Sequence, residues 1–266
     1  MTTIPSPLRL LLSRQALQVW RTPIERVLGA RRHEFVVLEE AVGQARDDVD
    51  VAFISRDITG VSTKHELASE TRACYDLMRR STRLQWVHIH SAGADRPIYV
   101  ELRQRGVVVT TSSGANAEVV AQSALAGVLA LARRLPQLID AQRARRWTPL
   151  LGPQLPRDLS GQRVVLVGWG PIGQRIGAML HLLGLQVQVV RQRADAAPVP
   201  GFSMLPFEQM MQVLPSTDWL ILACPLTAKT RGLVNAEVLA ALPCGASLIN
   251  VSRGEVVQES DLCAAL

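Results

Sequence analysis

Three glycines at the end of an apolar run constrain the fold of this chain more than any other feature. Residues 163–173 read RVVLVGWGPIG, and Gly168, Gly170 and Gly173 give this stretch the spacing G-x-G-x-x-G. In a dinucleotide-binding fold the first glycine permits a tight turn from strand to helix, the second lets a diphosphate approach the backbone, and the third lets the helix pack closely on the strand. The N–H groups at the start of that helix then face the anion. The motif therefore predicts a dinucleotide-binding α/β unit.

A second predicted strand, residues 186–190, ends where a dinucleotide fold reads the ribose of its coenzyme. NAD-preferring proteins present an acidic residue at this place, whereas a cation accommodates the additional phosphate of NADP. The residues here read VVRQRAD, with Arg191 and Arg193 and no carboxylate before Asp195. The pattern predicts NADP in preference to NAD. Two solvated arginines in a loop are the alternative interpretation, which would leave the choice of coenzyme open.

Length and composition predict a globular protein with two domains. The chain has 266 residues, of which 48% are hydrophobic, so it is long enough for two domains with buried cores. Its longest strongly apolar stretch, residues 124–132, is too short to span a bilayer. The first residues lack the continuous apolar core of a secretory signal. We therefore expect a cytoplasmic protein without a membrane partner.

Charge and cysteine content argue against two other classes of function. The formal net charge is +6, but the basic residues are spread along the whole chain without a binding motif, so we expect no nucleic-acid partner. The cysteines show neither C-x-x-C spacing nor a compact cluster with histidine, which argues against a zinc site and against a disulfide framework. We expect no metal and four reduced thiols, at Cys74, Cys224, Cys244 and Cys263.

The order of the predicted elements divides the chain into two α/β domains. Short β-branched runs alternate with segments of helical length in the first part of the chain, and the same alternation follows the glycine motif. Such alternation predicts a parallel sheet with crossover helices in each domain, in a Rossmann-like or flavodoxin-like arrangement. The predicted strands are residues 8–12, 34–38, 51–55, 86–90 and 107–111 in the first domain, and 163–167, 186–190, 219–223 and 246–251 in the second.

A turn-rich cluster, residues 112–116, is the expected boundary between the two domains. The first domain would then span residues 1–115 and the second residues 116–266. The second domain begins with residues 117–146, an Ala- and Leu-rich segment interrupted by Pro136, so we expect a helix or a kinked pair of helices there. Its apolar face would pack on the core or on a second subunit.

Four segments, in this order along the chain, make it similar to a known enzyme family. They read WVHIHSAGAD (86–95), DLSGQRVVLVGWGPIG (158–173), LILACPLTAKTRGLVN (220–235) and ASLINVSRGEVV (246–257). The sequence resembles the D-isomer-specific 2-hydroxyacid dehydrogenases, and the last two segments are more diagnostic than the glycines. The resemblance implies an NAD(P)-dependent oxidoreductase that interconverts a small 2-oxo acid, such as glyoxylate or hydroxypyruvate, and its D-2-hydroxy acid. It also implies a substrate domain followed by a coenzyme domain, and a homodimer built on the long helix.

The resemblance places the family's active-site arginine at Arg253, whose guanidinium would bind the carboxylate or carbonyl of the substrate. A guanidinium suits a 2-oxo acid because it is always charged and presents a planar fork of donors. Pairing of Arg253 with a surface acid is the structural alternative. The backbone N–H groups of Ala92 and Gly93 would bind the other side of the carboxylate, and an ordinary tight turn is the alternative there.

The resemblance also assigns residues to the coenzyme, which we expect to be NADP, with NAD as the alternative. Cys224 among them is expected to be a buried thiol near the nicotinamide rather than a nucleophile, because no histidine lies near it in the sequence. The coenzyme residues are Gly168, Gly170, Pro171, Ile172, Gly173, Arg191, Arg193, Cys224, Pro225, Thr230, Val251 and Ser252.

One part of the family's chemistry has no counterpart in this sequence. In the family a histidine supported by a carboxylate supplies a proton to the alkoxide, and both residues lie downstream of the arginine that matches Arg253. Only 13 residues follow Arg253, and none of them is histidine. We therefore expect the second domain to be incomplete at its C-terminus. A truncated or frameshifted relative and a protein that continues further are both compatible with the sequence.

All five histidines of the chain precede Arg253, and two of them are candidates for a contact with the substrate. His88 and His90 point to one face of a predicted strand that leads toward Ala92, so one of them could approach a substrate. A packed residue with satisfied hydrogen bonds is the favoured interpretation of both. A chain without the family's proton donor could also be a catalytically silent dinucleotide-binding module, and this function is the alternative to the oxidoreductase.

Overall fold

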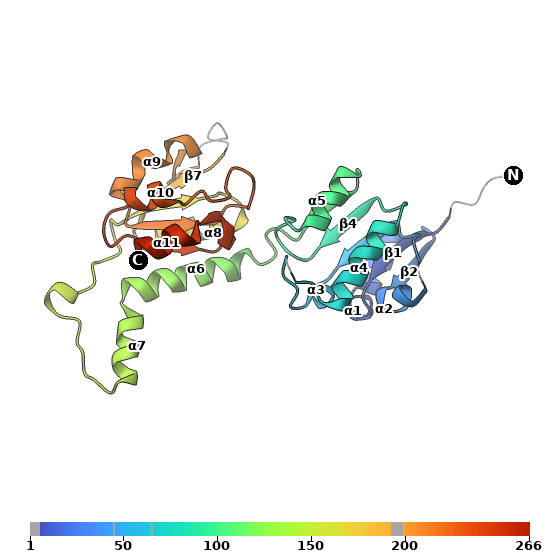
Figure 1. Cartoon of the computed structure of the whole chain (residues 1–266), viewed down its shortest axis with the longest axis horizontal. Coiled ribbons are helices and arrows are strands. Elements are labelled where there is room, and N and C mark those ends of the chain that lie inside the picture. Colours follow the sequence, from blue (N-terminus) through green and yellow to red (C-terminus); the bar gives the residue numbers. More distant parts are fainter. Residues whose placement is uncertain (1–5, 45, 65, 193–198) are drawn as a thin grey trace. The chain divides into compact units, whose positions relative to one another are not determined.

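A computed structural model describes residues 6–44, 46–64, 66–192 and 199–266 of the chain. The chain forms two compact units, residues 1–113 and residues 114–266. Each unit contains one five-stranded parallel sheet with helices between the strands (Figure 1). The predicted fold class, two α/β units with parallel sheets, is confirmed.

The N-terminal unit has the strand order β2-β1-β3-β4-β5. Its strands are β1 (Leu8–Leu12), β2 (His33–Val37), β3 (Val51–Ile54), β4 (Trp86–Ile89) and β5 (Val108–Thr111). Its helices are α1 (Arg14–Leu28), α2 (Leu38–Ala41), α3 (Arg56–Thr59), α4 (Ser69–Arg80) and α5 (Pro97–Gln104). The main core joins Leu11, Ile54 and Ile89 of the strands to Leu77 of α4 and Leu102 of α5. A smaller cluster forms under α1, so hydrophobic packing supports the sheet from two sides.

The C-terminal unit has the strand order β10-β9-β6-β7-β8, so the order reverses at β6. Its strands are β6 (Arg163–Val167), β7 (Gln186–Val190), β8 (Ser203–Leu205), β9 (Trp219–Leu222) and β10 (Ser247–Asn250). Its helices are α6 (Ala117–Ala132), α7 (Leu135–Arg143), α8 (Pro171–Leu182), α9 (Met210–Val213), α10 (Ala236–Ala241) and α11 (Glu259–Ala265). In an open parallel sheet, ligands bind outside the carboxyl ends of the strands where the order reverses. The end of β6 is therefore the expected place for a ligand.

The residues of β6 alternate between two cores. Val164 and Leu166 belong to the core under α6 and α8, and Val165 and Val167 belong to the core on the opposite face. All four side chains are fully buried. A strand that is covered on both faces reads as a continuous apolar run, which is why the stretch RVVLV marks this strand so clearly in the sequence.

Side-chain hydrogen bonds tie the amino ends of β6 and β9 together. The indole Nε1 of buried Trp219 donates to Oε1 of Gln162 over 2.6 Å. The carboxylate of Asp218 accepts a hydrogen bond from the backbone N of Arg163 over 2.8 Å and from the guanidinium of Arg157 over 2.7 Å. These contacts hold the strands together at their amino ends, and the glycine turn lies at the opposite, carboxyl ends.

The segment for which either a helix or a kinked pair of helices was expected forms the two helices α6 and α7, so the second alternative is the observed one. Arg134 lies between them in a left-handed backbone conformation with a φ of 52°. The strand β8 was not predicted, because three residues are too few to show a periodic pattern.

Two structural observations bear on the expected partners. Within the described residues, no helix is both long enough and apolar enough to cross a membrane. Over the same part of the chain, no group of three or more His, Cys, Asp or Glu side chains is placed to bind a metal ion. The thiols of Cys74 and Cys224 are buried and free, and those of Cys244 and Cys263 are exposed and free.

Candidate functional site

The glycine turn between β6 and α8 is tightly constrained by its own backbone. Gly168 has a φ of +105°, and a Cβ atom built on it would lie 2.7 Å from the backbone N of Cys224. A Cβ atom on Gly173 would lie 2.2 Å from the carbonyl oxygen of Gly168. Gly170 differs, because a Cβ atom there meets no protein atom within 4 Å and its φ is −76°. Packing therefore requires two of the glycines, and the third leaves open space at the start of α8.

The start of α8 supplies backbone donors beside that open space. The first N–H groups of a helix have no acceptor within the helix, and Pro171 at the first helical position has no N–H, so those of Ile172 and Gly173 are available to an anion. The backbone N of Gln174 donates to the carbonyl oxygen of Gly170 over 2.9 Å. The turn and its donors fit the diphosphate of a dinucleotide, because only hydrogen occupies the side-chain position of Gly170.

Most of the other predicted coenzyme residues lie beyond the carboxyl ends of the strands, on the same side of the sheet as the glycine turn. Val167 at the end of β6 pairs with Val190 of β7 and with Leu222 of β9. Leu222 in turn pairs with Asn250 of β10. The segments after these strand ends are the glycine turn, Arg191, the pair Cys224 and Pro225, and the run Val251, Ser252 and Arg253. The sheet thus brings these segments together, while Arg193 lies outside the described residues.

Thr230 organises the loop that follows β9. Its buried hydroxyl donates to the carbonyl oxygen of Pro225 over 2.6 Å. The same hydroxyl accepts a hydrogen bond from the backbone N of Thr227 over 2.8 Å. Thr230 therefore fixes the shape of the loop through its side chain.

Cys224 lies beneath the glycine turn and is 4% exposed. Burial raises the pKa of its thiol to about 11. Because the thiolate is the nucleophilic form of cysteine, a thiol with so high a pKa is a poor nucleophile near neutral pH. Its surroundings agree with the interpretation of Cys224 as a buried thiol.

Asn250 shapes the turn that carries Arg253. Its Oδ1 accepts hydrogen bonds from the backbone N and from the Oγ of Ser252, over 2.9 Å and 2.7 Å. Its Nδ2 donates to the carbonyl oxygen of Arg253 over 3.0 Å, and Nη1 of Arg253 donates to the carbonyl oxygen of Ser252 over 2.9 Å. Asn250 was not among the residues predicted for the site, although an asparagine two residues before a serine is a sequence signal for an Asx turn.

Arg191 lies directly after β7 and is attached to the neighbouring strand. Its backbone N donates to the carbonyl oxygen of Leu205 in β8 over 2.9 Å. Leu205 also pairs with Val190, the last residue of β7. The short strand β8 therefore fixes the position of the residue that was predicted to read the ribose.

Ala92 and Gly93 lie in the N-terminal unit, in the loop after β4, whereas the other described residues predicted for the site lie in the C-terminal unit. Ser91 Oγ donates to the carbonyl oxygen of Gly93 over 2.9 Å. Lys64 forms an ion pair with Asp95. Side chains thus hold the loop of the two predicted amides at both ends.

The two histidines that were weighed as substrate contacts are hydrogen-bonded within the N-terminal unit. Nδ1 of His88 lies 2.9 Å from Oγ1 of Thr110, and its Nε2 lies 3.1 Å from Oγ of Ser112. Nε2 of His90 lies 2.8 Å from Oγ1 of Thr59. Burial lowers the pKa of both imidazoles, and neighbouring arginines add to the effect at His90. These contacts agree with the interpretation of both as packed residues.

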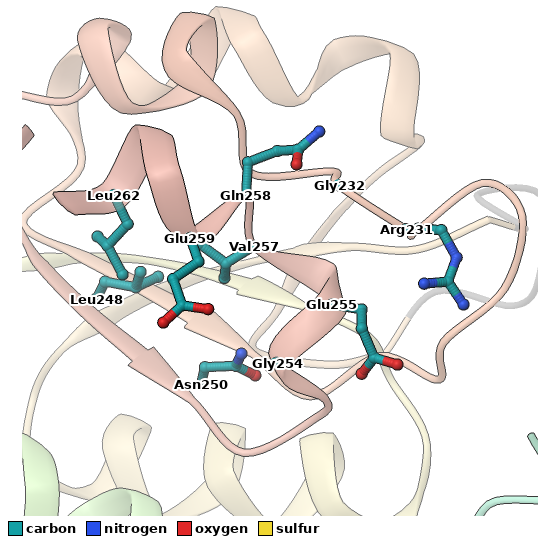
Figure 2. Close-up of a pocket in the computed structure, with 10 residues that line it drawn as sticks. All are labelled: Arg231, Gly232, Leu248, Asn250, Gly254, Glu255, Val257, Gln258, Glu259 and Leu262. Carbon is teal, nitrogen blue, oxygen red and sulfur yellow. The ribbon is translucent and has the colours of Figure 1, made fainter. Parts of the chain in front are cut away.

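A pocket of about 980 Å³ opens beside the turn that carries Arg253 (Figure 2). Figure 2 shows Leu248 and Leu262 together on one side and the charged side chains of Arg231 and Glu255 on the other. Its lining residues are Arg231, Gly232, Leu248, Asn250, Gly254, Glu255, Val257, Gln258, Glu259 and Leu262. These ten residues include none that was predicted to contact coenzyme or substrate, so this pocket and the glycine turn are different features of the unit.

Comparison with known proteins relates the chain to one enzyme family. Residues 125–266 match the family model described as D-isomer specific 2-hydroxyacid dehydrogenase, NAD binding domain. A glyoxylate/hydroxypyruvate reductase of Arabidopsis thaliana is 28% identical over 192 residues, which cover 72% of this chain and 58% of the relative. The glyoxylate reductase/hydroxypyruvate reductase of Mus musculus is 30% identical over 179 residues, which cover 66% of this chain and 54% of the relative. The chain thus spans little more than half the length of these curated relatives.

Solved structures share the fold of both units. A D-isomer specific 2-hydroxyacid dehydrogenase from Xanthobacter autotrophicus Py2, in complex with NADPH and MES, is 26% identical with a TM-score of 0.71, over 98% of this chain and 77% of that chain. A glyoxylate reductase from Paecilomyes thermophila is 20% identical with a TM-score of 0.73, over 99% of this chain and 78% of that chain. The second likeness is one of fold alone.

We predict that Gly170→Ala leaves the thermal stability of the protein unchanged and weakens dinucleotide binding at least about tenfold, or about 1.4 kcal/mol. The added methyl group meets no protein atom within 4 Å but occupies the space that a diphosphate needs. Thermal unfolding and calorimetric titration with NADPH and NADH measure the two effects. Gly173→Ala is the matched control, because the same methyl group would lie 2.2 Å from a backbone oxygen and should lower the melting temperature. Unchanged affinity in Gly170→Ala would contradict this placement of the diphosphate.

We predict that iodoacetamide at pH 8 modifies two of the four cysteines in the folded protein. Cys244 and Cys263 are exposed, whereas burial raises the pKa of the Cys74 and Cys224 thiols to about 12 and about 11. Thiolate at the buried positions is scarce at pH 8 and becomes abundant only as the pH rises toward those values. Mass spectrometry should count two adducts on native protein and four in urea. Rapid labelling of native Cys224 at pH 8 would refute the prediction.

Proposed function

Because the chain belongs to the D-isomer specific 2-hydroxyacid dehydrogenase family, we propose that it is an oxidoreductase that transfers hydride between a nicotinamide dinucleotide and a small 2-oxo or D-2-hydroxy acid. The glycine turn is the observation that carries this proposal. Backbone atoms lie too close to Gly168 and Gly173 for either residue to carry a side chain. Gly170 leaves open space beside the first N–H groups of α8. The similarity to glyoxylate/hydroxypyruvate reductases supports glyoxylate or hydroxypyruvate as the oxo acid.

The proposed placement of the coenzyme is at the carboxyl ends of the strands in the C-terminal unit. The diphosphate would accept hydrogen bonds from the N–H groups of Ile172 and Gly173, next to Pro171. A bound nicotinamide would supply hydride to the carbonyl carbon of the oxo acid, and the alkoxide that forms would take its proton from water. In the reverse direction the nicotinamide would accept hydride from the carbon that carries the hydroxyl group, whose proton would pass to water. The residues proposed to line its side of the site are Cys224, Pro225, Thr230, Val251 and Ser252.

NADP is the proposed preferred coenzyme. Arg191 occupies the position after β7 where NAD-preferring proteins present a carboxylate, and a guanidinium forms strong charged hydrogen bonds with a phosphate. Arg193 belongs to the same proposal, although it lies outside the described residues. The relative from Xanthobacter autotrophicus, which was solved in complex with NADPH, supports this choice.

Arg253 is the residue proposed to bind and orient the acid. A guanidinium is planar and presents two parallel donors to a carboxylate. Asn250 holds the carbonyl oxygen of Arg253, so the side chain extends from a fixed turn. The backbone N–H groups of Ala92 and Gly93 are proposed to donate to the same carboxylate.

A homodimer formed through α6 and α7 completes the proposal. Figure 1 shows α7 projecting away from the sheet of its own unit. Large apolar side chains on and after these helices remain exposed, and exposed apolar surface of this kind marks interfaces between proteins. They include Leu131, Leu135, Ile139 and Trp147.

We predict that Arg191→Gln raises the dissociation constant of NADPH at least about tenfold and leaves that of NADH unchanged. A hydrogen bond to a charged group contributes about 1.5–3 kcal/mol, and NADH lacks the phosphate that would accept it. Calorimetric titration of both coenzymes measures the change. Arg146→Gln, at an exposed position of the same unit, is the control. Tighter binding of NADH than NADPH by the wild type, or unchanged NADPH affinity in Arg191→Gln, would defeat the NADP assignment.

We predict that the wild type oxidises NADPH in the presence of glyoxylate or hydroxypyruvate, and that Arg253→Lys lowers kcat/KM for these acids about 10- to 100-fold. Lysine keeps the charge but loses the planar pair of donors, and the dissociation constant of NADPH should not change. Steady-state absorbance at the NADPH band, with calorimetry, measures both quantities. Coenzyme binding without oxidation by either acid would instead support a catalytically silent dinucleotide-binding module.

A further inference from the structure

The side chain inside the glycine motif belongs to an aromatic cluster on α8. Trp169 stands between Gly168 and Gly170, and its ring centroid lies 4.8 Å from that of Phe202 at a tilt of 54°. The ring of Phe202 lies 5.6 Å from the ring of His181. Trp169 and Phe202 are partly buried and pack against the core under α6 and α8. The motif specifies only its glycines, yet the residue between them is fixed by its neighbours.

The indole of Trp169 packs against the backbone of Gly177 in α8. A Cβ atom built on Gly177 would lie 2.8 Å from Cζ3 of Trp169 and 3.1 Å from Cε1 of Phe202. Gly177 lies within the helix, where glycine is a poor helix former. The two rings occupy the place of the missing side chain, which explains why glycine stands at this helical position.

The same helix also holds the backbone of Trp169. The carbonyl oxygen of Trp169 accepts a hydrogen bond from Nε2 of Gln174 over 3.2 Å. The ring and the carbonyl group therefore attach the residue to α8 at two points. The peptide units on either side of Trp169 belong to the turn that is proposed to hold the diphosphate, so a displaced indole would displace the turn.

Phe202 connects the indole to the residue that is proposed to read the ribose. Phe202 directly precedes β8, and all three residues of β8 pair with β7. At the other end of β8, the carbonyl oxygen of Leu205 accepts the hydrogen bond from the backbone N of Arg191. A contact at the start of β8 therefore helps to fix the strand whose end holds Arg191.

We propose that Trp169 is a positioning residue that determines coenzyme preference, because it links the diphosphate turn to β8 and, through β8, to Arg191. The inference rests on the proposed binding of a nicotinamide dinucleotide. The backbone N of Gly168 donates to the carbonyl oxygen of Val190 over 2.8 Å, so pairing of β6 with β7 supports Arg191 from one side. The indole, which packs on Gly177 and against Phe202, supports Arg191 from the other side through β8. Loss of the indole weakens NADPH binding more than NADH binding, because only NADPH uses the guanidinium.

The test is calorimetric titration of NADPH and NADH into the full chain and its variants. We expect Trp169→Ala to raise the dissociation constant of NADPH about fivefold more than that of NADH, the scale of one lost aromatic contact. Trp169→Phe should restore most of the wild-type preference, because a phenyl ring still reaches an aromatic neighbour. Leu182→Ala, at a position of α8 that is 85% exposed, is the control and should change neither constant.

A double substitution tests whether Trp169 affects coenzyme preference through Arg191. In an Arg191→Gln background, Trp169→Ala should no longer alter the ratio of the two dissociation constants, because the group that it positions is absent. If circular dichroism shows that Trp169→Ala is unfolded, Trp169→Leu replaces it, since leucine keeps an apolar side chain in the core. Gly177→Ala, which displaces the ring without removing it, should shift the preference in the same direction.

Different negative outcomes would overturn this inference and the proposed function. An equal loss of affinity for both coenzymes, or an unchanged ratio in every Trp169 variant, would overturn the coupling and leave the coenzyme site in place. Failure of the wild type to bind either coenzyme would overturn the proposed function itself.

Discussion

The close approach of two glycines at the end of β6 sets the geometry of the C-terminal unit. Gly168 turns the chain beside the backbone of Cys224, and α8 then returns so near to the sheet that Gly173 faces the carbonyl oxygen of Gly168. Contacts of this kind exist only where neither residue has a side chain. They place the first N–H groups of α8 next to the point at which the strand order reverses.

The requirement for small residues continues along α8. Gly177 accepts the rings of Trp169 and Phe202 against the helix backbone. The helix therefore contacts the end of β6 at its first turn and the start of β8 through an aromatic pair further along. One helix thus relates the two segments that are proposed to bind opposite ends of an adenosine diphosphate.

Features that are encoded locally could be predicted from the sequence. The strand β6 was visible because burial on both faces makes its residues continuously apolar, and the glycine spacing identified the turn that follows. Arg191 could be placed because it directly follows a recognisable strand. The parallel architecture followed from the alternation of such strands with helices.

Features that depend on contacts between distant residues could not be predicted. Trp169 and Phe202 lie 33 positions apart in the sequence, and no periodicity relates them. The strand β8 is too short to give a pattern, yet it holds Arg191 in place. Asn250 acts through a turn whose geometry only the folded chain reveals. The contacts of Arg253 and Ala92 with an acid are still predictions, because they concern a bound molecule.

The amino and the carboxyl ends of the strands in the C-terminal sheet differ in what their polar groups contact. At the amino ends of β6 and β9, the indole of Trp219 and the carboxylate of Asp218 form hydrogen bonds entirely within the protein. At the carboxyl ends, Gly170 leaves open space beside the first N–H groups of α8, which are proposed to bind the diphosphate of a coenzyme. Substitutions at Trp219 or Asp218 therefore alter folding alone, whereas at the carboxyl ends the consequence depends on the position: a side chain at Gly168 or Gly173 would disturb packing, and one at Gly170 would not.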